Sequence, residues 1–176
     1  MPVLQTPRLA LREMTDDDAE FVLVLLNDAS FLRYIGDRGV RSLDGARDYI
    51  RKGPVASYRR NGFGLYLVEL KGTGESVGTC GLVRREGLDD VDIGFAFLPQ
   101  YRTQGYATEA ATAVMMHARD VLGFTRIVAI ASPDNDRSAN VLRKIGLRFE
   151  RMIRLTENEP EIKLFAWEAR REGAPG

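Results

Sequence analysis

The pattern that most constrains the fold of this chain is a strand, a loop and a helix in succession over residues 93–123. An apolar run over residues 93–98 predicts a strand that ends at Pro99. A helical pattern over residues 110–122 follows and stops at Gly123. The first amides of a helix have no partner inside the helix and lie at the positive end of its dipole. A loop with small residues at this position therefore predicts a site for phosphate oxygens.

The loop over residues 102–107 has the composition of a pyrophosphate cradle. Gly105 and Ala107 let a ligand approach the backbone closely, and Arg102 offers a fixed positive charge with a planar fork. The alternative is an ordinary connection between a strand and a helix, because short motifs also occur by chance. Two other nucleotide motifs do not fit. No G-x-x-x-x-G-K-[ST] sequence occurs, and the glycines of residues 72–78 are misspaced for a dinucleotide-binding fingerprint.

Length and composition predict one globular domain over residues 1–176, with a frayed tail at residues 170–176. The chain has 25 Lys and Arg residues and 25 Asp and Glu residues, a balance that argues against nucleic acid or a membrane surface as partner. Cys80 is the only cysteine, which excludes a disulfide framework and a cysteine-based metal site, and we expect no metal. No signal core or membrane span is recognisable, so we expect a cytoplasmic protein.

The order of elements is predicted as βαα-βββ-αβ-αββ, which makes a mixed sheet with the cradle near its middle. Strands are expected over residues 9–14, 64–70, 76–85, 91–98, 126–131, 147–155 and 161–169. Helices are expected from Thr15 as N-cap, over residues 42–60 with a break near Gly53 and Pro54, and over residues 110–122 and 138–145. Residues 31–36 are expected to form an apolar connection that either lines a pocket or fills the core.

Three stretches resemble one known family. Residues 97–110 resemble the acetyl-coenzyme-A signature of the GNAT family of N-acetyltransferases, and residues 135–147 resemble its second conserved block. Residues 4–12 resemble the start of the ribosomal-protein alanine N-acetyltransferase (RimJ/RimL-type) branch. The three matches occur in the right order and cover essentially the whole chain. The resemblance implies a single-domain α/β (α+β) GNAT-like fold, with a mixed, mostly antiparallel sheet of about seven strands and helices on both faces.

The resemblance also implies how acetyl-coenzyme A would be held. Backbone groups of Phe97 and Leu98 would bind the pantetheine arm together with Asn135, and Lys144 or Arg143 would face the nucleotide phosphates. The alternative for the two basic residues is a solvated helix face. The implied cofactor-binding residues are Phe97, Leu98, Arg102, Thr103, Gln104, Gly105, Tyr106, Ala107, Thr108, Asn135, Ser138 and Lys144.

The catalytic residues are less clearly marked by the resemblance. A backbone amide near Leu98 would polarise the thioester carbonyl. Many family members place a tyrosine acid in the second block, but Leu142 stands at the matching position, and Ser138 is the acid implied by the ribosomal branch. The alternative for Ser138 is a helix-terminal residue that binds backbone amides. Asp92 is the candidate base, although an amine that is already neutral needs none, and His117 is expected to be a packing or surface residue.

The function implied is acetyl transfer from acetyl-coenzyme A to a primary amine, either a protein N-terminus or a small molecule. Phe31 and Tyr34, in the apolar connection, are the candidate acceptor-binding residues. A non-catalytic acyl-coenzyme-A-binding module is the alternative, favoured by Leu142, and an unrelated α/β protein with an accidental loop would not bind coenzyme A at all. Both a monomer and a homodimer are compatible with the sequence.

Overall fold

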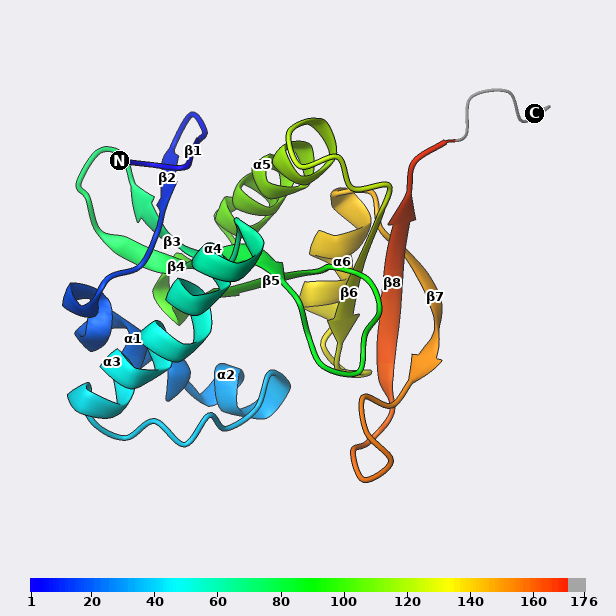
Figure 1. Ribbon diagram of the computed structural model, residues 1–176, viewed down its shortest axis with the longest axis horizontal. Helices are drawn as coiled ribbons and strands as arrows, with labels where there is room; N and C mark the ends of the chain where they lie inside the picture. The colour runs from blue at the N-terminus through cyan, green and yellow to red at the C-terminus, as the bar shows by residue number, and fades with distance from the viewer. Residues whose placement is uncertain (171–176) are drawn as a thin grey trace.

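A single eight-stranded sheet forms the centre of the computed structural model, which describes residues 1–170 (Figure 1). The strands lie in the order β1-β2-β3-β4-β5-β6-β8-β7, and every pair is antiparallel except β5 and β6. Their bounds are β1 Leu4–Gln5, β2 Leu9–Arg12, β3 Leu65–Leu70, β4 Ser76–Val83, β5 Asp92–Phe97, β6 Arg126–Ala131, β7 Arg148–Ile153 and β8 Ile162–Glu168. The predicted mixed, mostly antiparallel sheet is confirmed. The two-residue β1 is an additional strand that is too short to leave a periodic pattern.

Within residues 1–170, six α-helices cover the sheet on both faces, as expected for the fold. Their bounds are α1 Ala19–Leu26, α2 Ala29–Tyr34, α3 Leu43–Ile50, α4 Ala56–Asn61, α5 Tyr106–Asp120 and α6 Asp136–Lys144. Helices α5 and α6 share one hydrophobic cluster with one side of the sheet, and α1 and α3 share a second cluster with the other side. No helix in this described part is both long and apolar enough to cross a membrane. The predicted frayed tail lies, from residue 171 onward, outside the described residues.

Two predicted elements differ from the structure. The apolar connection over residues 31–36 is largely helix α2, which the Asp28 carboxylate caps by accepting a hydrogen bond from the Phe31 amide at 3.2 Å. A six-residue helix is too short to show helical periodicity in the sequence. The predicted break at Gly53 and Pro54 is a π-helical turn, Arg51–Val55, which carries the chain from α3 into α4. This turn accommodates the proline, which has no backbone donor.

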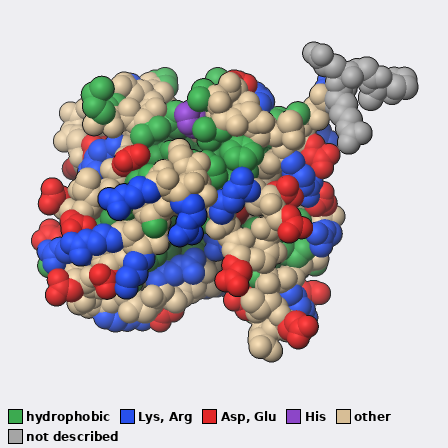
Figure 2. All heavy atoms as spheres, in the orientation of Figure 1, with side chains coloured by type: hydrophobic (Ala, Val, Ile, Leu, Met, Phe, Trp, Pro, Cys, Tyr) green, Lys and Arg blue, Asp and Glu red, His purple; other side chains and the backbone are tan. Residues whose placement is uncertain are grey.

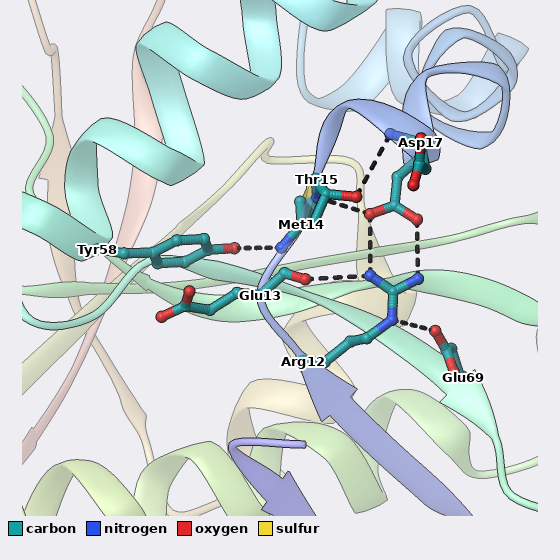
Figure 3. Close-up of polar contacts among 8 residues, drawn as sticks. Arg12, Glu13, Met14, Thr15, Asp17, Tyr58 and Glu69 are labelled. Carbon is teal, nitrogen blue, oxygen red and sulfur yellow. Dashed lines mark hydrogen bonds and ion pairs between the residues drawn. The ribbon is translucent and has the colours of Figure 1, made fainter. Parts of the chain in front are cut away.

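The turn from β2 into α1 is fixed by a polar network around Arg12 (Figure 3). The Arg12 guanidinium donates to both oxygens of Asp18, at 2.8 and 2.9 Å, and also pairs with Glu69 on β3. Asp18 accepts a further bond from the Thr15 amide at 2.8 Å and completes a capping box, which confirms Thr15 as an N-cap. Tyr58 on α4 accepts from the Met14 amide at 3.1 Å, so the helical layer is tied to the sheet at this corner.

The two parallel strands separate almost at once. A single residue pair, Asp92 and Val128, joins β5 to β6, whereas β5 pairs with β4 over its whole length. Gly94, Phe95 and Ala96 are only half-buried, although they lie in the middle of the sheet. The sheet is therefore open between β5 and β6 beyond Asp92.

Candidate active site

The open edge of β5 carries free backbone groups. In an antiparallel ladder, alternate residues turn their peptide groups toward the partner strand. The Leu98 amide donates to the Val77 carbonyl on β4 at 3.0 Å, so Phe95 and Phe97 turn theirs toward the gap. The Leu98 amide is thus engaged with β4, so an amide near Leu98 that polarises a thioester carbonyl would have to be one that faces the gap, such as that of Phe97. The gap instead offers an edge to which an extended polar chain can hydrogen-bond.

At the end of this edge, six consecutive amides point to no protein acceptor. Thr103 and Gly105 have left-handed backbones, with φ of 62° and 82°, and α5 begins at Tyr106, four residues before the predicted start. The Gly105 carbonyl receives the Glu109 amide at 3.0 Å, but the amides of residues 103–108 find no acceptor among the described residues. Because they include the unpaired first turn of a helix, they form a concave donor surface suited to an anion. This geometry fits the predicted pyrophosphate cradle.

Arg8, which the sequence did not indicate, supports this loop from the turn before β2. Its guanidinium donates to the Gln104 carbonyl at 2.9 Å, pairs with Glu109 at 3.3 Å and stacks over the Tyr106 ring at 4.4 Å. Arg8 and the loop are almost a hundred residues apart, so no local pattern could connect them. A Cβ on Gly105 would lie only 3.2 Å from the Arg8 side chain, which leaves little room for a larger residue.

Arg102 does not extend into the cradle, contrary to the prediction. Its guanidinium pairs with Asp28 at 2.9 Å, donates to the Ser30 hydroxyl at 3.1 Å and donates to the Phe97 carbonyl at 2.9 Å. The side chain is only 23% exposed. The nearby Asp28 carboxylate therefore neutralises the charge that was expected to face a phosphate.

The second predicted block lies across the gap from the cradle, because the carboxyl ends of two parallel strands meet at the same edge. Asn135 caps α6 by accepting a hydrogen bond from the Ser138 amide at 3.3 Å. The half-buried Ser138 hydroxyl has no hydrogen-bond partner within residues 1–170. Lys144 is exposed near the opposite end of α6, and Leu142 is 1% exposed inside the core. The structure thus groups Asn135 and Ser138 near the gap and excludes Leu142 from it.

Asp92 lies where β5 and β6 part and is 1% exposed. One of its oxygens accepts from the Arg85 guanidinium at 2.8 Å, and the other is buried without a partner in the described chain. Burial raises the pKa of Asp92 to about 6, and Arg85 opposes that rise. A carboxyl group with this pKa exchanges a proton near neutral pH. His117 is half-buried on α5, in agreement with its expected packing role.

A family model described as Acetyltransferase (GNAT) domain matches residues 8–148, well over half of the chain. The chain belongs to the GNAT acetyltransferase family. This confirms the predicted family and enzyme class, an N-acetyltransferase that uses acetyl-coenzyme A.

Relatives of this GNAT enzyme align over most of their lengths. It is 29% identical to the uncharacterized N-acetyltransferase YoaA and 31% identical to the uncharacterized protein YkkB, both of Bacillus subtilis (strain 168). These matches cover 87% and 86% of this chain, and 86% and 88% of the relatives. An acetyltransferase (GNAT family) from Bacillus anthracis superposes with a TM-score of 0.78 at 27% identity, covering 94% of this chain and 97% of that one.

A more distant neighbour shares only the fold. RimL, a ribosomal alpha-N-protein acetyltransferase solved in complex with coenzyme A, has a TM-score of 0.82 at 19% identity and covers 96% of this chain and 98% of its own.

A GNAT enzyme also needs a site for the amine, and a cavity of about 60 Å³ lies on the other side of β5 from α5 and α6. Helices α1, α2 and α3 cover it, and β3, β4 and β5 form its floor. Phe31 lines this cavity, one of the two positions expected for residues 31–36, together with Tyr49, Arg38 and Arg85, which the sequence did not indicate. Tyr34 is not among the lining residues; its carbonyl accepts from the Ser132 hydroxyl at 3.0 Å.

Helix α2 connects the loops that follow the two separated strands. Its start is bound by Arg102, from the loop after β5. Its end is bound by Ser132 and by Asp134, which pairs with Arg33 at 3.0 Å, from the loop after β6. The helix therefore lies beside the carboxyl ends of both strands and also contributes Phe31 to the cavity.

Proposed function

We propose that this enzyme transfers the acetyl group of acetyl-coenzyme A directly to a primary amine bound in the cavity beneath α2, in a complex that holds both substrates. The observation that carries this proposal is the row of acceptor-free amides over residues 103–108 at the end of an open strand edge. The cavity touches the same strand at Gly94, Phe95 and Ala96. The amine and the thioester could thus meet at β5 from opposite sides.

The residues present fit acetyl-coenzyme A, which supplies a thioester-activated acetyl group. The amides of residues 103–108 would hold the pyrophosphate, with the Thr108 hydroxyl at the helix start. The open edge at Phe95 and Phe97, with Asn135 across the gap, would bind the pantetheine arm. For Arg102 we propose that only the backbone takes part, since its guanidinium is bound elsewhere. Lys144 is exposed and free to approach a nucleotide phosphate.

In acetyl transfer a carbon–nitrogen bond forms and a carbon–sulfur bond breaks, while the amine gives up one proton and the departing thiolate gains one. Asp92, with a pKa near 6, would be ionised at neutral pH and would accept the amine proton, directly or through a water. Arg85 would hold the Asp92 carboxylate in place. The free hydroxyl of Ser138, at the gap, would donate the proton to the thiolate.

A second candidate is a non-catalytic module that binds acyl-coenzyme A. The observation in its favour is Leu142, a buried leucine at the position where many family members carry a tyrosine acid. Such a module would bind coenzyme A without releasing a thiol in the presence of any amine. We propose that either protein works in the cytoplasm, as a monomer or homodimer, with an amine acceptor and with neither nucleic acid nor a membrane as partner.

Two variants test the proposal, and for each of them the binding of coenzyme A and the release of its thiol are measured. Gly105→Glu introduces a carboxylate at the cradle on a left-handed backbone, so coenzyme A binding and thiol release across a panel of amines should both be lost. Gly123→Glu is the matched control: Gly123 is also left-handed, with φ of 74°, but lies beyond the far end of α5 with open space around it. Normal coenzyme A binding by Gly105→Glu would contradict the site.

A further inference from the structure

The cavity beneath α2 has an unusual charge for a site that receives an amine. Among the described residues that line it, the two charged side chains are both arginines, Arg38 and Arg85. Arg85 is paired with Asp92 at 2.8 Å. Arg38, in the exposed segment after α2, forms no ion pair with any carboxylate of residues 1–170. The cavity therefore presents one uncompensated guanidinium.

Basic side chains also gather locally on one face of the molecule (Figure 2). Figure 2 shows Lys and Arg side chains gathered over the middle of the face, between the helical part of the molecule and the β7–β8 hairpin, with hydrophobic side chains visible between them. The chain as a whole is neutral, with 25 basic and 25 acidic residues. The positive charge on this face is thus a local feature.

This charge discriminates between classes of amine. A polyamine or a lysine side chain arrives as a cation, and the unpaired Arg38 guanidinium repels it. An amine with a neighbouring carboxylate avoids this repulsion, because a planar guanidinium binds a carboxylate through two parallel hydrogen bonds. In a peptide, the first residue has a neutral peptide bond where a free amino acid has its carboxylate. A peptide N-terminus therefore forms no ion pair with Arg38.

The rest of the lining is suited to hydrocarbon. Side chains from α1, α2, β3 and the segment between β2 and α1 make it predominantly apolar: Met14, Val22, Leu25, Leu26, Phe31 and Leu65. Tyr49 adds a hydroxyl that makes no hydrogen bond with the described residues, and burial raises the pKa of Tyr49, so it stays a neutral donor. At about 60 Å³ the space is of the size of a small side chain.

We propose that the acceptor is a free α-amino acid with an apolar side chain, whose carboxylate is bound by Arg38 and whose side chain occupies the apolar cavity. This inference rests on the proposed acetyl transfer and adds the class of the acceptor. Arg38 is a specificity-determining residue in this arrangement, while Asp92 and Ser138 serve any amine.

Matched acceptors test the carboxylate. Thiol release from acetyl-coenzyme A is measured with L-leucine, L-leucinamide and a short peptide that begins with leucine. Loss of a charge-assisted hydrogen bond should lower kcat/KM by about tenfold or more, so leucine should exceed both other acceptors by that factor. Arg38→Ala should lower kcat/KM for leucine by about tenfold and should not lower kcat/KM for leucinamide, because the variant removes the bond to the carboxylate and also the repulsion of a cationic amine. Arg38→Lys, which keeps the charge without the fork, should retain part of the preference.

Arg59→Ala is the control for a general loss of positive charge, because Arg59 is an exposed arginine on α4 that lies outside the cavity lining. This variant should keep the preference for leucine. Calorimetric titration of leucine into protein saturated with coenzyme A measures binding without turnover, and Arg38→Ala should weaken this binding by about tenfold.

The outcomes separate the two proposals. Equal or better use of leucinamide or of the peptide, or turnover only with amines that lack a carboxylate, would overturn the inference and leave acetyl transfer standing. If coenzyme A binds but no amine releases a thiol, acetyl transfer is overturned. The titration then decides the part of the inference that concerns binding: leucine binding that depends on Arg38 supports an amino-acid site in the cavity, and absence of such binding overturns it.

Discussion

The carboxyl group of Asp92 is buried and has one hydrogen-bonding partner, Arg85. These two features determine its pKa, and through the pKa both its ability to accept a proton and its effect on stability. Its carboxyl group is 1% exposed, and one oxygen has no partner among the described residues. Desolvation disfavours the charged form, while Arg85 favours it. The balance raises the pKa of Asp92 to about 6, which leaves the group mostly ionised at neutral pH.

The pH dependence of kcat/KM should report this group. Activity should rise as the pH passes through about 6, because only the ionised carboxylate accepts a proton. Arg85→Met removes the charge that lowers the pKa of Asp92, so the acidic limb of the profile should move to higher pH. Arg84→Met changes the neighbouring arginine, which lies over the Phe63 and Phe124 rings, and should leave the limb in place. If Arg85→Met left the acidic limb of the pH profile of kcat/KM unchanged, Asp92 would not be the general base.

Asp92 should also destabilise the fold at neutral pH. Its pKa is higher in the folded protein than the ordinary 3.8, which means that the fold favours the protonated form. The resulting contribution to the free energy of unfolding is fully present below pH 3.8 and is lost as the pH rises through about 6. Asp92→Asn mimics the protonated form and should raise the free energy of unfolding at pH 7.5 by on the order of 2 kcal/mol. Urea unfolding at several pH values checks this, since the two proteins should converge below pH 4.

Asp89→Asn is the matched control for that measurement, because Asp89 is exposed in the turn before β5. This variant measures the effect of removing a carboxylate from an exposed position. A difference between Asp92→Asn and wild type that stays constant over the pH range would show that the pKa of the buried carboxyl group is not raised.

At the scale of elements, α2 is the part whose position depends most on side chains from elsewhere. Arg102 binds its first turn, and Ser132 and Asp134 bind its end. Because α2 also carries Phe31 into the cavity, the loops that end β5 and β6 determine where the acceptor site is covered.

Arg102→Ala should therefore impair use of the acceptor more than binding of the cofactor. The Arg102–Asp28 pair is largely shielded from water, so its loss should displace α2 and raise the KM for the amine by about tenfold. Calorimetry should show a much smaller change in the Kd of coenzyme A. Asp28→Asn breaks the same pair from the other side and should behave alike. If Arg102→Ala raised the Kd of coenzyme A more than the KM of the amine, the guanidinium would have to contact the phosphates of the cofactor after all.

At the scale of the whole molecule, the local patterns predicted a mixed sheet and the strand and helix that flank residues 102–107, and the family resemblance implied that the sheet is mostly antiparallel. The apolar run, Pro99 and the long helix pattern lie within one continuous segment, so their arrangement can be read without tertiary information. The family resemblance supplied the grouping with Asn135 and Ser138. The two-residue β1 and six-residue α2 were too short for any periodicity to show.

The destinations of charged side chains required the tertiary structure. Arg102 was expected at the phosphate because it belongs to the loop over residues 102–107, but Asp28, more than seventy residues earlier, binds its guanidinium instead. The cavity is assembled from three helices and three strands, so Arg38 and Tyr49 have no common motif. Arg8 contacts the cradle from a position almost a hundred residues earlier in the chain, so no local motif connects the two either.

Hydrogen exchange should reveal the break in the sheet. Amides of Phe95 and Phe97, which face the gap, should exchange rapidly in the free protein and slowly once coenzyme A is bound. Amides within the fully paired β3–β4 ladder should be slow in both states. Gap-facing amides that are already protected without coenzyme A would show that the two strands are joined in solution.

The single bridge between Asp92 and Val128 has a mechanical consequence. It divides the sheet into a five-stranded and a three-stranded block that share almost no backbone hydrogen bonds, so their mutual orientation depends on packing by α5 and α6 behind and by α2 at the rim. An extended ligand such as the pantetheine arm, bound in the gap between β5 and β6, would hydrogen-bond to β5 as an additional strand does. It would thereby fix the orientation of the two blocks relative to each other. Occupancy by the cofactor would then change the angle between the two blocks, and with it the position of α2 over the acceptor cavity.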